Sequence, residues 1–244
     1  MQVTVKLFAG LRDIVGGDIV ESFEGDSVPV SVLRERLGEA HPKLAPYLAG
    51  VAIAVNEEYI LQDGEELRDG DEVALIPPIS GGSDESDDGD ASHFLVTTEA
   101  LDARALRDLV LTDASGAVVV FEGVVRDHHE GHAVLRLEYH AYDSMARRQL
   151  AAVAEEVLHE YRDRELHDIA IHHRTGTLEV GEVSLLVAVS AAHREDAFAA
   201  ALRTVDRVKE TVPVWKKEYG PDGATWQEGV EPKPAFRATA ASEG

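Results

Sequence analysis

A group of basic residues between His193 and Lys217 interrupts an otherwise acidic sequence. The 244-residue chain has 46 aspartates and glutamates against 23 lysines and arginines, which gives a formal net charge of -23. A local excess of positive charge in so acidic a chain indicates an anionic ligand, although a helix face with internal ion pairs has a similar composition. The basic residues are Arg194, Arg203, Arg207, Lys209, Lys216 and Lys217, and the acidic ones are Glu195, Asp196, Asp206 and Glu210.

Lys209 stands out by its position on a helix expected from Glu195 to Thr211. At about 100° per residue, with Phe198 as zero, Leu202 and Val205 fall within roughly 40° of it and Lys209 near 20°. Lys209 is therefore expected in the middle of an apolar stripe. Its side chain would either extend along the helix to water, or place its amine in a cleft. In a cleft, burial and neighbouring cations would lower the pKa of the amine and suit it to act as an acid, a base or a nucleophile.

Lys216 follows soon after this helix. The helix is expected to end near Pro213, because the residue before a proline disfavours helical backbone angles. After such a break the chain could return Lys216, which lies beside Trp215, to the site of Lys209.

A second chemical feature is the diglycine Gly81-Gly82, which follows Pro77 and Pro78 closely. Prolines prevent a sheet from continuing, and glycines supply a thin segment without side chains. Such a tail can enter a narrow site and present a backbone carbonyl at its tip. A plain linker has the same composition.

Composition excludes several classes of function. The chain has no cysteine, so it has no disulfide, thiolate metal site or cysteine nucleophile, and any sulfur chemistry must use imported sulfur. Its negative charge argues against binding to nucleic acid or to anionic lipid. No apolar run reaches the roughly 18 residues that a membrane helix needs, and the N-terminus lacks a signal-peptide pattern. We therefore expect a soluble, cytoplasmic protein.

No cofactor or metal is expected. The sequence contains no phosphate-binding loop, dinucleotide fingerprint or nucleophile elbow. Its histidines match no ligand spacing, and the group His128, His129 and His132 lies in an expected loop. We interpret these imidazoles as solvated or packed side chains.

The first part of the chain predicts four strands and one helix. The strands are expected over residues 3–7, 18–23, 51–55 and 72–76. Ser31 is expected to cap the helix, which ends before Pro42. A helix lying across one mixed sheet is the economical arrangement, and the order is that of a ubiquitin-like β-grasp domain.

The second part alternates strands with helices and is assigned to the α+β class. The expected strands cover residues 117–125, 134–142, 169–172 and 183–190, and the expected helices cover 145–161 and 195–211. Between the two parts lies a polar, acidic, glycine-bearing segment that cannot bury apolar surface and is expected to be a flexible linker. The predicted organisation is a domain at 1–82, a linker at 83–92, a domain at 93–230 and a disordered tail at 231–244.

The first domain resembles the small subunit of molybdopterin synthase, a sulfur carrier. The resemblance rests on Leu7-Phe8-Ala9, Gly70-Asp71-Glu72-Val73-Ala74 and the closing Pro77-Pro78-Ile79-Ser80-Gly81-Gly82. In that family the terminal glycine is activated as an adenylate and converted to a thiocarboxylate. The resemblance thus implies that Gly81 and Gly82 form the carrier tail. Here Ser83 follows, so a free carboxylate at Gly82 requires cleavage after it.

The second domain resembles the large catalytic subunit of the same synthase, which implies an α/β hammerhead-type fold. Three segments carry the resemblance: residues 116–126, the run Ser190-Ala191-Ala192-His193-Arg194, and residues 209–218, which include Pro213-Val214-Trp215-Lys216-Lys217-Glu218. Carried across position by position, it implies catalytic roles for Lys209 and Lys216. It also implies substrate binding by Arg126, His193, Arg194, Lys217 and Glu218.

The resemblance implies transfer of sulfur from a glycine thiocarboxylate to cyclic pyranopterin monophosphate, forming the dithiolene of molybdopterin. The implied partners are that pterin, an adenylating and sulfurating enzyme acting on Gly82, a protease cutting after Gly82, and a second copy of the C-terminal domain in a homodimer. Two alternatives remain at this point: a ubiquitin-like protein modifier with a passive C-terminal partner, and a non-catalytic anion-binding module.

Overall fold

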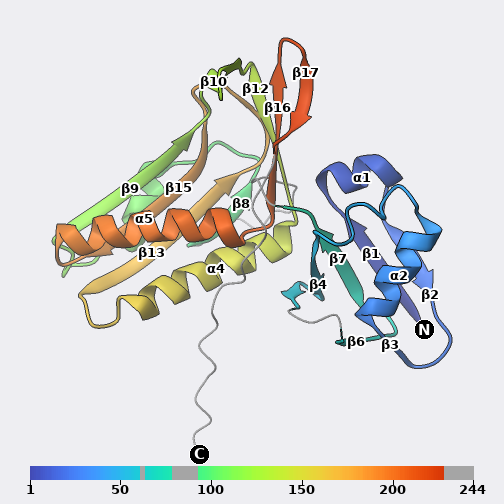
Figure 1. Ribbon diagram of the computed structural model, residues 1–244. Helices are drawn as coiled ribbons and strands as arrows, with labels where there is room; N and C mark the ends of the chain where they lie inside the picture. The colour runs from blue at the N-terminus through green and yellow to red at the C-terminus, as the bar shows by residue number, and fades with distance from the viewer. Residues whose placement is uncertain (61–63, 79–92, 228–244) are drawn as a thin grey trace, which may run out of the picture. The chain divides into compact units, whose positions relative to one another are not determined.

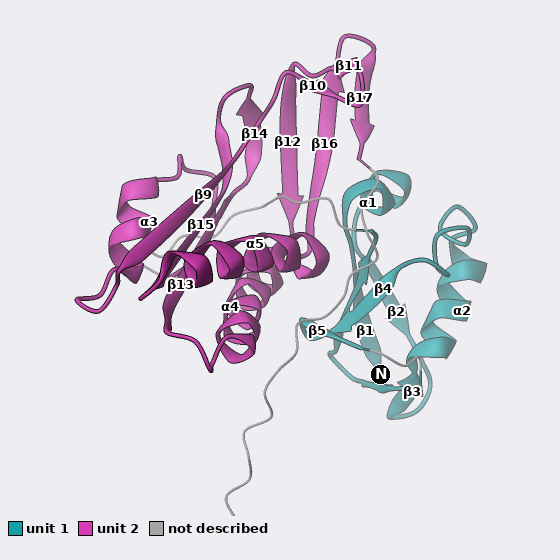
Figure 2. Cartoon of the chain, turned by 60° about the vertical axis from the view of Figure 1, so that its left-hand side comes forward, with its two compact units in different colours: residues 1–80, 228–232 teal, residues 81–227, 233–244 magenta. Residues whose placement is uncertain are grey.

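A computed structural model describes residues 1–60, 64–78 and 93–227, which form two compact units. The first unit contains residues 1–60 and 64–78, and the second contains residues 93–227 (Figure 2). The predicted linker, the predicted tail and the glycines Gly81 and Gly82 lie outside the described residues. Within the described residues, no helix has the length and apolar character needed to cross a membrane.

The first unit is a mixed five-stranded sheet in the order β2-β1-β7-β4-β5. The central strand β1 pairs antiparallel with β2 and parallel with β7. Leu33 and Leu37 of α2 are fully buried in the same core as alternate residues of β1, such as Val5 and Leu7. This arrangement confirms the β-grasp prediction. Its elements are β1 (Gln2–Leu7), α1 (Ala9–Val15), β2 (Ile19–Ser22), β3 (Ser27–Pro29), α2 (Val30–Ala40), β4 (Ala52–Val55), β5 (Glu58–Tyr59), β6 (Glu66–Arg68) and β7 (Glu72–Ile76).

The first unit differs from the sequence prediction in the start of its main helix and in several short elements. Helix α2 begins at Val30 with Pro29 as its N-cap residue, so the prediction that Ser31 caps it is wrong. Pro29 has φ of -62°, the value to which its ring confines the backbone, and the helix begins two residues earlier than expected. The short helix α1 and the short strands β3, β5 and β6 were not expected.

The second unit contains two four-stranded sheets, β8-β13-β15-β9 and β14-β12-β16-β17 (Figure 1). Its elements are β8 (Phe94–Thr97), α3 (Ala103–Val110), β9 (Ala117–Val124), β10 (His128–His129), β11 (His132–Ala133), β12 (Arg136–Ala141), α4 (Asp143–Glu160), β13 (Leu166–Arg174), β14 (Gly176–Glu179), β15 (Val183–Ala191), α5 (Arg194–Thr211), β16 (Val214–Gly220) and β17 (Gly223–Trp226).

Helices cover both faces of the first of these sheets. Ile171 and Val187 point to the face covered by α4 and α5, whereas Ala170 and Ala188 point to the face covered by α3. Burial on both faces explains why β13 and β15 read as nearly continuous apolar runs. All six strands and helices expected in this domain are present, with small shifts at their ends.

Candidate active site

Lys209 and Lys216 lie on either side of the junction between α5 and β16. Helix α5 ends at Thr211, two residues before Pro213, and β16 begins at Val214. Lys209 is thus in the last turn of the helix and Lys216 is the third residue of the strand. A short, proline-bearing junction therefore brings the two predicted catalytic amines into one region.

The surroundings of Lys216 define the site. Its half-buried amine has a lowered pKa, first because burial disfavours the charged form and then because the cations of Arg126 and Lys209 repel it. The carboxylate of Glu218 acts in the opposite direction and raises the pKa. Four of the predicted residues, Arg126, Lys209, Lys216 and Glu218, are therefore close enough to interact electrostatically.

Strand geometry explains why Glu218 belongs to this group and Lys217 does not. Side chains alternate between the two faces of a strand, so Lys216 and Glu218 share a face and Lys217 lies on the other. There the ammonium of Lys217 lies 5.0 Å from the centre of the Trp226 ring. A role for Lys217 in lining the same pocket stays a prediction.

The apolar stripe predicted for α5 is buried only in part: Val205 is 5% exposed, but the prediction is wrong for the other two residues. Phe198 and Leu202 are both 65% exposed, and Lys209 is exposed as well. The helix instead packs through small side chains such as Ala197 and Ala200. Position on the helix therefore does not bury Lys209, and its pairing with Lys216 comes from the junction that follows.

His193 and Arg194 lie at the opposite end of the same helix. Arg194 and Lys209 are fifteen positions apart in the sequence, which is about 22 Å along an α-helix. His193 and Arg194 are both exposed, and Nε2 of His193 lies 3.4 Å from Oε2 of Glu165. Within one chain, the structure does not bring these two predicted residues to the lysines.

One residue of the site was missed by sequence reasoning. Nδ1 of His129 lies 3.3 Å from Oε2 of Glu218, and the two side chains are only 24% and 11% exposed. His129 belongs to β10, which pairs with β11 in a hairpin whose turn has Glu130 and Gly131 at positive φ. The expected loop is therefore a structured hairpin, and the Glu130-Gly131 pair between histidines was the signal for a tight turn.

The arrangement suits an anionic substrate. Three cations, Arg126, Lys209 and Lys216, face a single carboxylate, Glu218. Arg126 and Lys209 make no ion pair with any described residue, so their charge is available to a ligand. An amine with a lowered pKa can give up or take a proton near neutral pH more readily than an ordinary lysine. No group of three histidine, aspartate or glutamate side chains among the described residues could hold a metal ion.

Comparisons with known proteins give the family. Residues 96–211 match the family model of the MoaE protein, and residues 5–82 match that of the ThiS family. The molybdopterin synthase catalytic subunit of Staphylococcus carnosus is 41% identical over 134 residues, which is 55% of this chain and 87% of that protein. The chain belongs to the molybdopterin synthase catalytic subunit family. The corresponding subunit of Oryza sativa subsp. indica is 46% identical over 131 residues, or 54% of this chain and 66% of that protein.

A solved structure agrees with this family. Molybdopterin synthase from Staphylococcus aureus superposes with a TM-score of 0.53 at 37% identity, covering 56% of this chain and 97% of that one. The MoaE match contains Arg126, His193, Arg194 and Lys209, whereas Lys216 and Glu218 lie beyond its end. Together with the ThiS match, it confirms the fusion of a carrier-like domain to a molybdopterin synthase catalytic domain and does not favour a protein modifier.

Proposed function

We propose that this chain carries both halves of molybdopterin synthase and acts as a sulfurtransferase. Sulfur would pass, in two separate turns, from a thiocarboxylate at Gly82 to cyclic pyranopterin monophosphate. The observation that supports this most directly is the half-buried amine of Lys216, whose pKa is lowered by burial and by Arg126 and Lys209.

Each residue of the site has a role suited to its surroundings. Arg126 would hold the phosphate through charge-assisted hydrogen bonds. Lys216 and Lys209 would stabilise negative charge that develops at the acyl and pterin centres, and one of them would also move a proton. Glu218 would orient Lys216 and keep its amine from losing its proton too early.

The site would be completed by a second copy of the chain. At about 100° per residue, Arg194, Phe198, Leu202 and Lys209 fall within roughly 80° on one face of α5. The two apolar residues in the middle of this face are 65% exposed. Two copies of α5 packed antiparallel about Leu202 would place Arg194 and His193 of one copy beside Lys209 of the other, and would cover both apolar side chains.

Substitution of Lys209 tests the catalytic assignment. Lys209→Ala should lower the rate of product formation by on the order of 100-fold or more, because it removes charge that acts on the transition state. The exposed side chain supports little packing, so the melting temperature should stay within about 2 °C of wild type. Arg104→Ala, at an exposed position on α3, is the matched control. Near-normal turnover by the Lys209→Ala variant would refute the role.

Mixing two inactive variants tests the shared site. Arg194→Ala and Lys209→Ala chains, unfolded and reassembled together, form mixed dimers with one intact site in two. Random pairing should then restore about a quarter of the wild-type activity. If each chain instead contains a whole site, the mixture will be no more active than its parts.

The carrier half depends on chemistry at Gly82, for which an adenylating and sulfurating enzyme and a protease cutting after Gly82 are the proposed partners. Intact mass spectrometry of the protein from its own host tests this directly. A fragment ending at Gly82 with one oxygen replaced by sulfur is the expected product. If only the unmodified full-length chain is found, sulfur reaches the catalytic domain from a separate carrier.

A further inference from the structure

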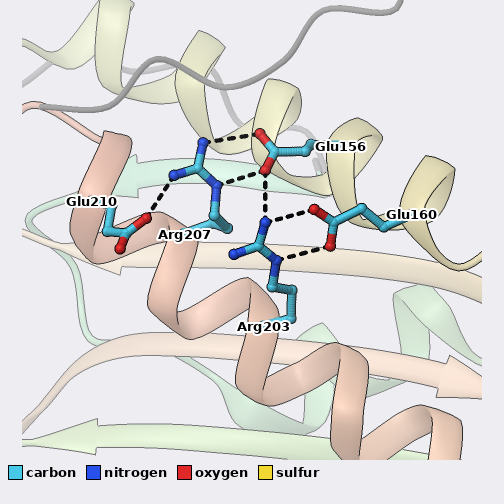
Figure 3. Close-up of polar contacts among 5 residues, drawn as sticks. All are labelled: Glu156, Glu160, Arg203, Arg207 and Glu210. Atoms are coloured by element: carbon cyan, nitrogen blue, oxygen red, sulfur yellow. Dashed lines mark hydrogen bonds and ion pairs between the residues drawn. The ribbon is translucent and has the colours of Figure 1, made fainter.

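A network of charged side chains with a buried pair at its centre joins α4 to the C-terminal half of α5 (Figure 3). Arg207 donates from Nε to Oε1 of Glu156 at 2.6 Å and from Nη2 to Oε2 at 3.0 Å. Both side chains are only 7% exposed. This is a two-pronged arginine–carboxylate contact, the geometry that fixes both the distance and the relative orientation of its partners.

The network continues in both directions along α5. Arg207 also donates from Nη1 to Oε2 of Glu210 at 2.8 Å, so it binds the residue that follows Lys209. One turn earlier, Arg203 donates to both oxygens of Glu160, at 2.8 and 2.6 Å, and from Nη2 to Oε1 of Glu156 at 3.3 Å (Figure 3).

Stability alone does not explain a buried ion pair. Removing two charges from water is costly, and well-packed apolar residues of similar size are often as stabilising or more so. The Glu156–Arg207 pair does, however, fix the relative orientation of α4 and α5. The core that α4 and α5 share contains several alanines, including Ala146, Ala154, Ala200 and Ala201, alongside larger apolar side chains. Short side chains interlock little, and the two-pronged arginine–carboxylate contact adds a constraint on sliding and rotation of one helix against the other.

We propose that the Glu156–Arg207 pair is a positioning device that holds the last turn of α5, and with it Lys209, at the place beside Lys216 that turnover requires. The inference rests on the proposed function of the two lysines. Lys209 lies between Arg207 and Glu210, which are hydrogen-bonded to each other, so the turn that carries it is joined to α4 through Arg207. Glu156 and Arg207 act through Lys209 and touch no substrate.

The test replaces both partners together, so that neither Glu156 nor Arg207 is left buried without the other. In Glu156→Leu/Arg207→Met, the melting temperature should equal or exceed that of wild type, because apolar side chains of similar volume replace the pair. The kcat should fall about tenfold, since a displacement of about 1 Å at a catalytic group costs up to 100-fold. The KM for the pterin should change less than about twofold.

A second measurement is independent of turnover. The pKa of Lys216 can be followed by competitive acylation at a series of pH values, with peptide mass spectrometry as the readout. Lys209 contributes to lowering this pKa. If Lys209 is no longer held in place, the pKa of Lys216 should rise in the double variant. This result would stand even if the reaction assigned to the site proved to be a different one.

The matched control is the neighbouring, more exposed pair. Glu160→Gln/Arg203→Gln removes side chains that are both 37% exposed and should leave both kcat and the pKa of Lys216 unchanged. Arg207→Lys keeps the positive charge but cannot form the two-pronged contact with Glu156, so it should reproduce part of the fall in kcat. It serves as the test if the double variant does not fold. A stable double variant, or a folded Arg207→Lys variant, with wild-type kcat and an unchanged Lys216 would overturn the proposal.

Discussion

Arg207 and Lys216 are basic residues nine positions apart, yet their surroundings act on their pKa in opposite directions. Hydrogen bonds to Glu156 raise the pKa of Arg207, although burial opposes them. Burial and neighbouring cations lower the pKa of Lys216, and Glu218 only partly compensates. In the region around Arg207 each guanidinium is hydrogen-bonded to carboxylates, so its positive charge is balanced within the protein. In the region around Lys216 cations outnumber carboxylates, so the net positive charge favours an anionic ligand.

The difference separates charges that build the fold from charges that serve a ligand. Oppositely charged side chains that balance one another do not require a ligand. Like charges held close together repel one another, and this repulsion costs free energy until an anion binds. Both regions share helix α5, where Arg207 and Glu210 of the paired region lie on either side of Lys209. The paired charges are therefore placed to support the last turn of α5, which carries Lys209.

The largest expected effect comes from breaking the paired region on one side only. Glu156→Ala leaves Arg207 buried without its main partner and should lower the free energy of unfolding by about 3–5 kcal/mol. Urea titration of the second unit, followed by circular dichroism, measures it. Glu160→Ala, which removes a more exposed partner of Arg203, is the control and should cost less than about 1 kcal/mol. Equal losses in the two variants would contradict the contrast between buried and exposed pairs.

The corresponding change in the region around Lys216 should affect activity and leave the fold intact. Lys216→Met removes a cation that acts on developing charge and should lower kcat by about 100- to 1,000-fold. Its effect on stability should be slightly favourable at pH 7. Because the folded-state pKa of Lys216 is lowered, the unfolded chain binds the extra proton more tightly, and wild-type stability rises as the pH approaches about 10.5, the ordinary lysine value.

The gain in stability of Lys216→Met over wild type should therefore be present at pH 7 and disappear above about pH 10.5. Thermal melts of both proteins across this range measure it. Lys217→Met, on the opposite face of β16, is the comparison for stability, since its ammonium contacts Trp226. A Lys216→Met variant that is less stable than wild type at pH 7 would show that the amine is bound by partners that outweigh its burial.

Sequence patterns predicted the strands and helices better than they predicted which helix face is buried. For α5 the stripe through Phe198 and Leu202 was expected in the core, but the alanine face is buried instead. A single helix offers two apolar faces here, and only the partner helix decides between them. In contrast, β13 and β15 are buried on both faces, so no such choice arises and both were predicted.

The site was predictable where a family resemblance named its residues and not where it depended on contacts between distant elements. The resemblance named Lys216 and Glu218. The run of charged residues there obscures the alternation of apolar and polar residues by which strand β16 could have been predicted. The spacing of four between Glu156 and Glu160, and between Arg203 and Arg207, is visible in the sequence. The glutamates contact the arginines only because α4 packs against α5 at this point. Local sequence patterns do not predict how the two helices pack.

The smallest expected effect concerns Glu218, the carboxylate of the region around Lys216. Nδ1 of His129 lies 3.3 Å from Oε2 of Glu218. His129→Asn keeps a hydrogen-bond donor near this carboxylate but removes the imidazole. We expect kcat to stay within about twofold of wild type, because Glu218 keeps a partner that holds it beside Lys216.

The control for this variant is His132→Asn, which alters the exposed residue opposite His129 in the same hairpin. It should leave kcat unchanged. If both substitutions lower kcat equally, the hairpin as a whole and not the imidazole of His129 influences the site. If His129→Asn alone lowers kcat by more than about tenfold, the imidazole does more than support Glu218. The region around Lys216 would then include a fifth functional side chain, supplied by a hairpin outside the helix and strand that carry the lysines.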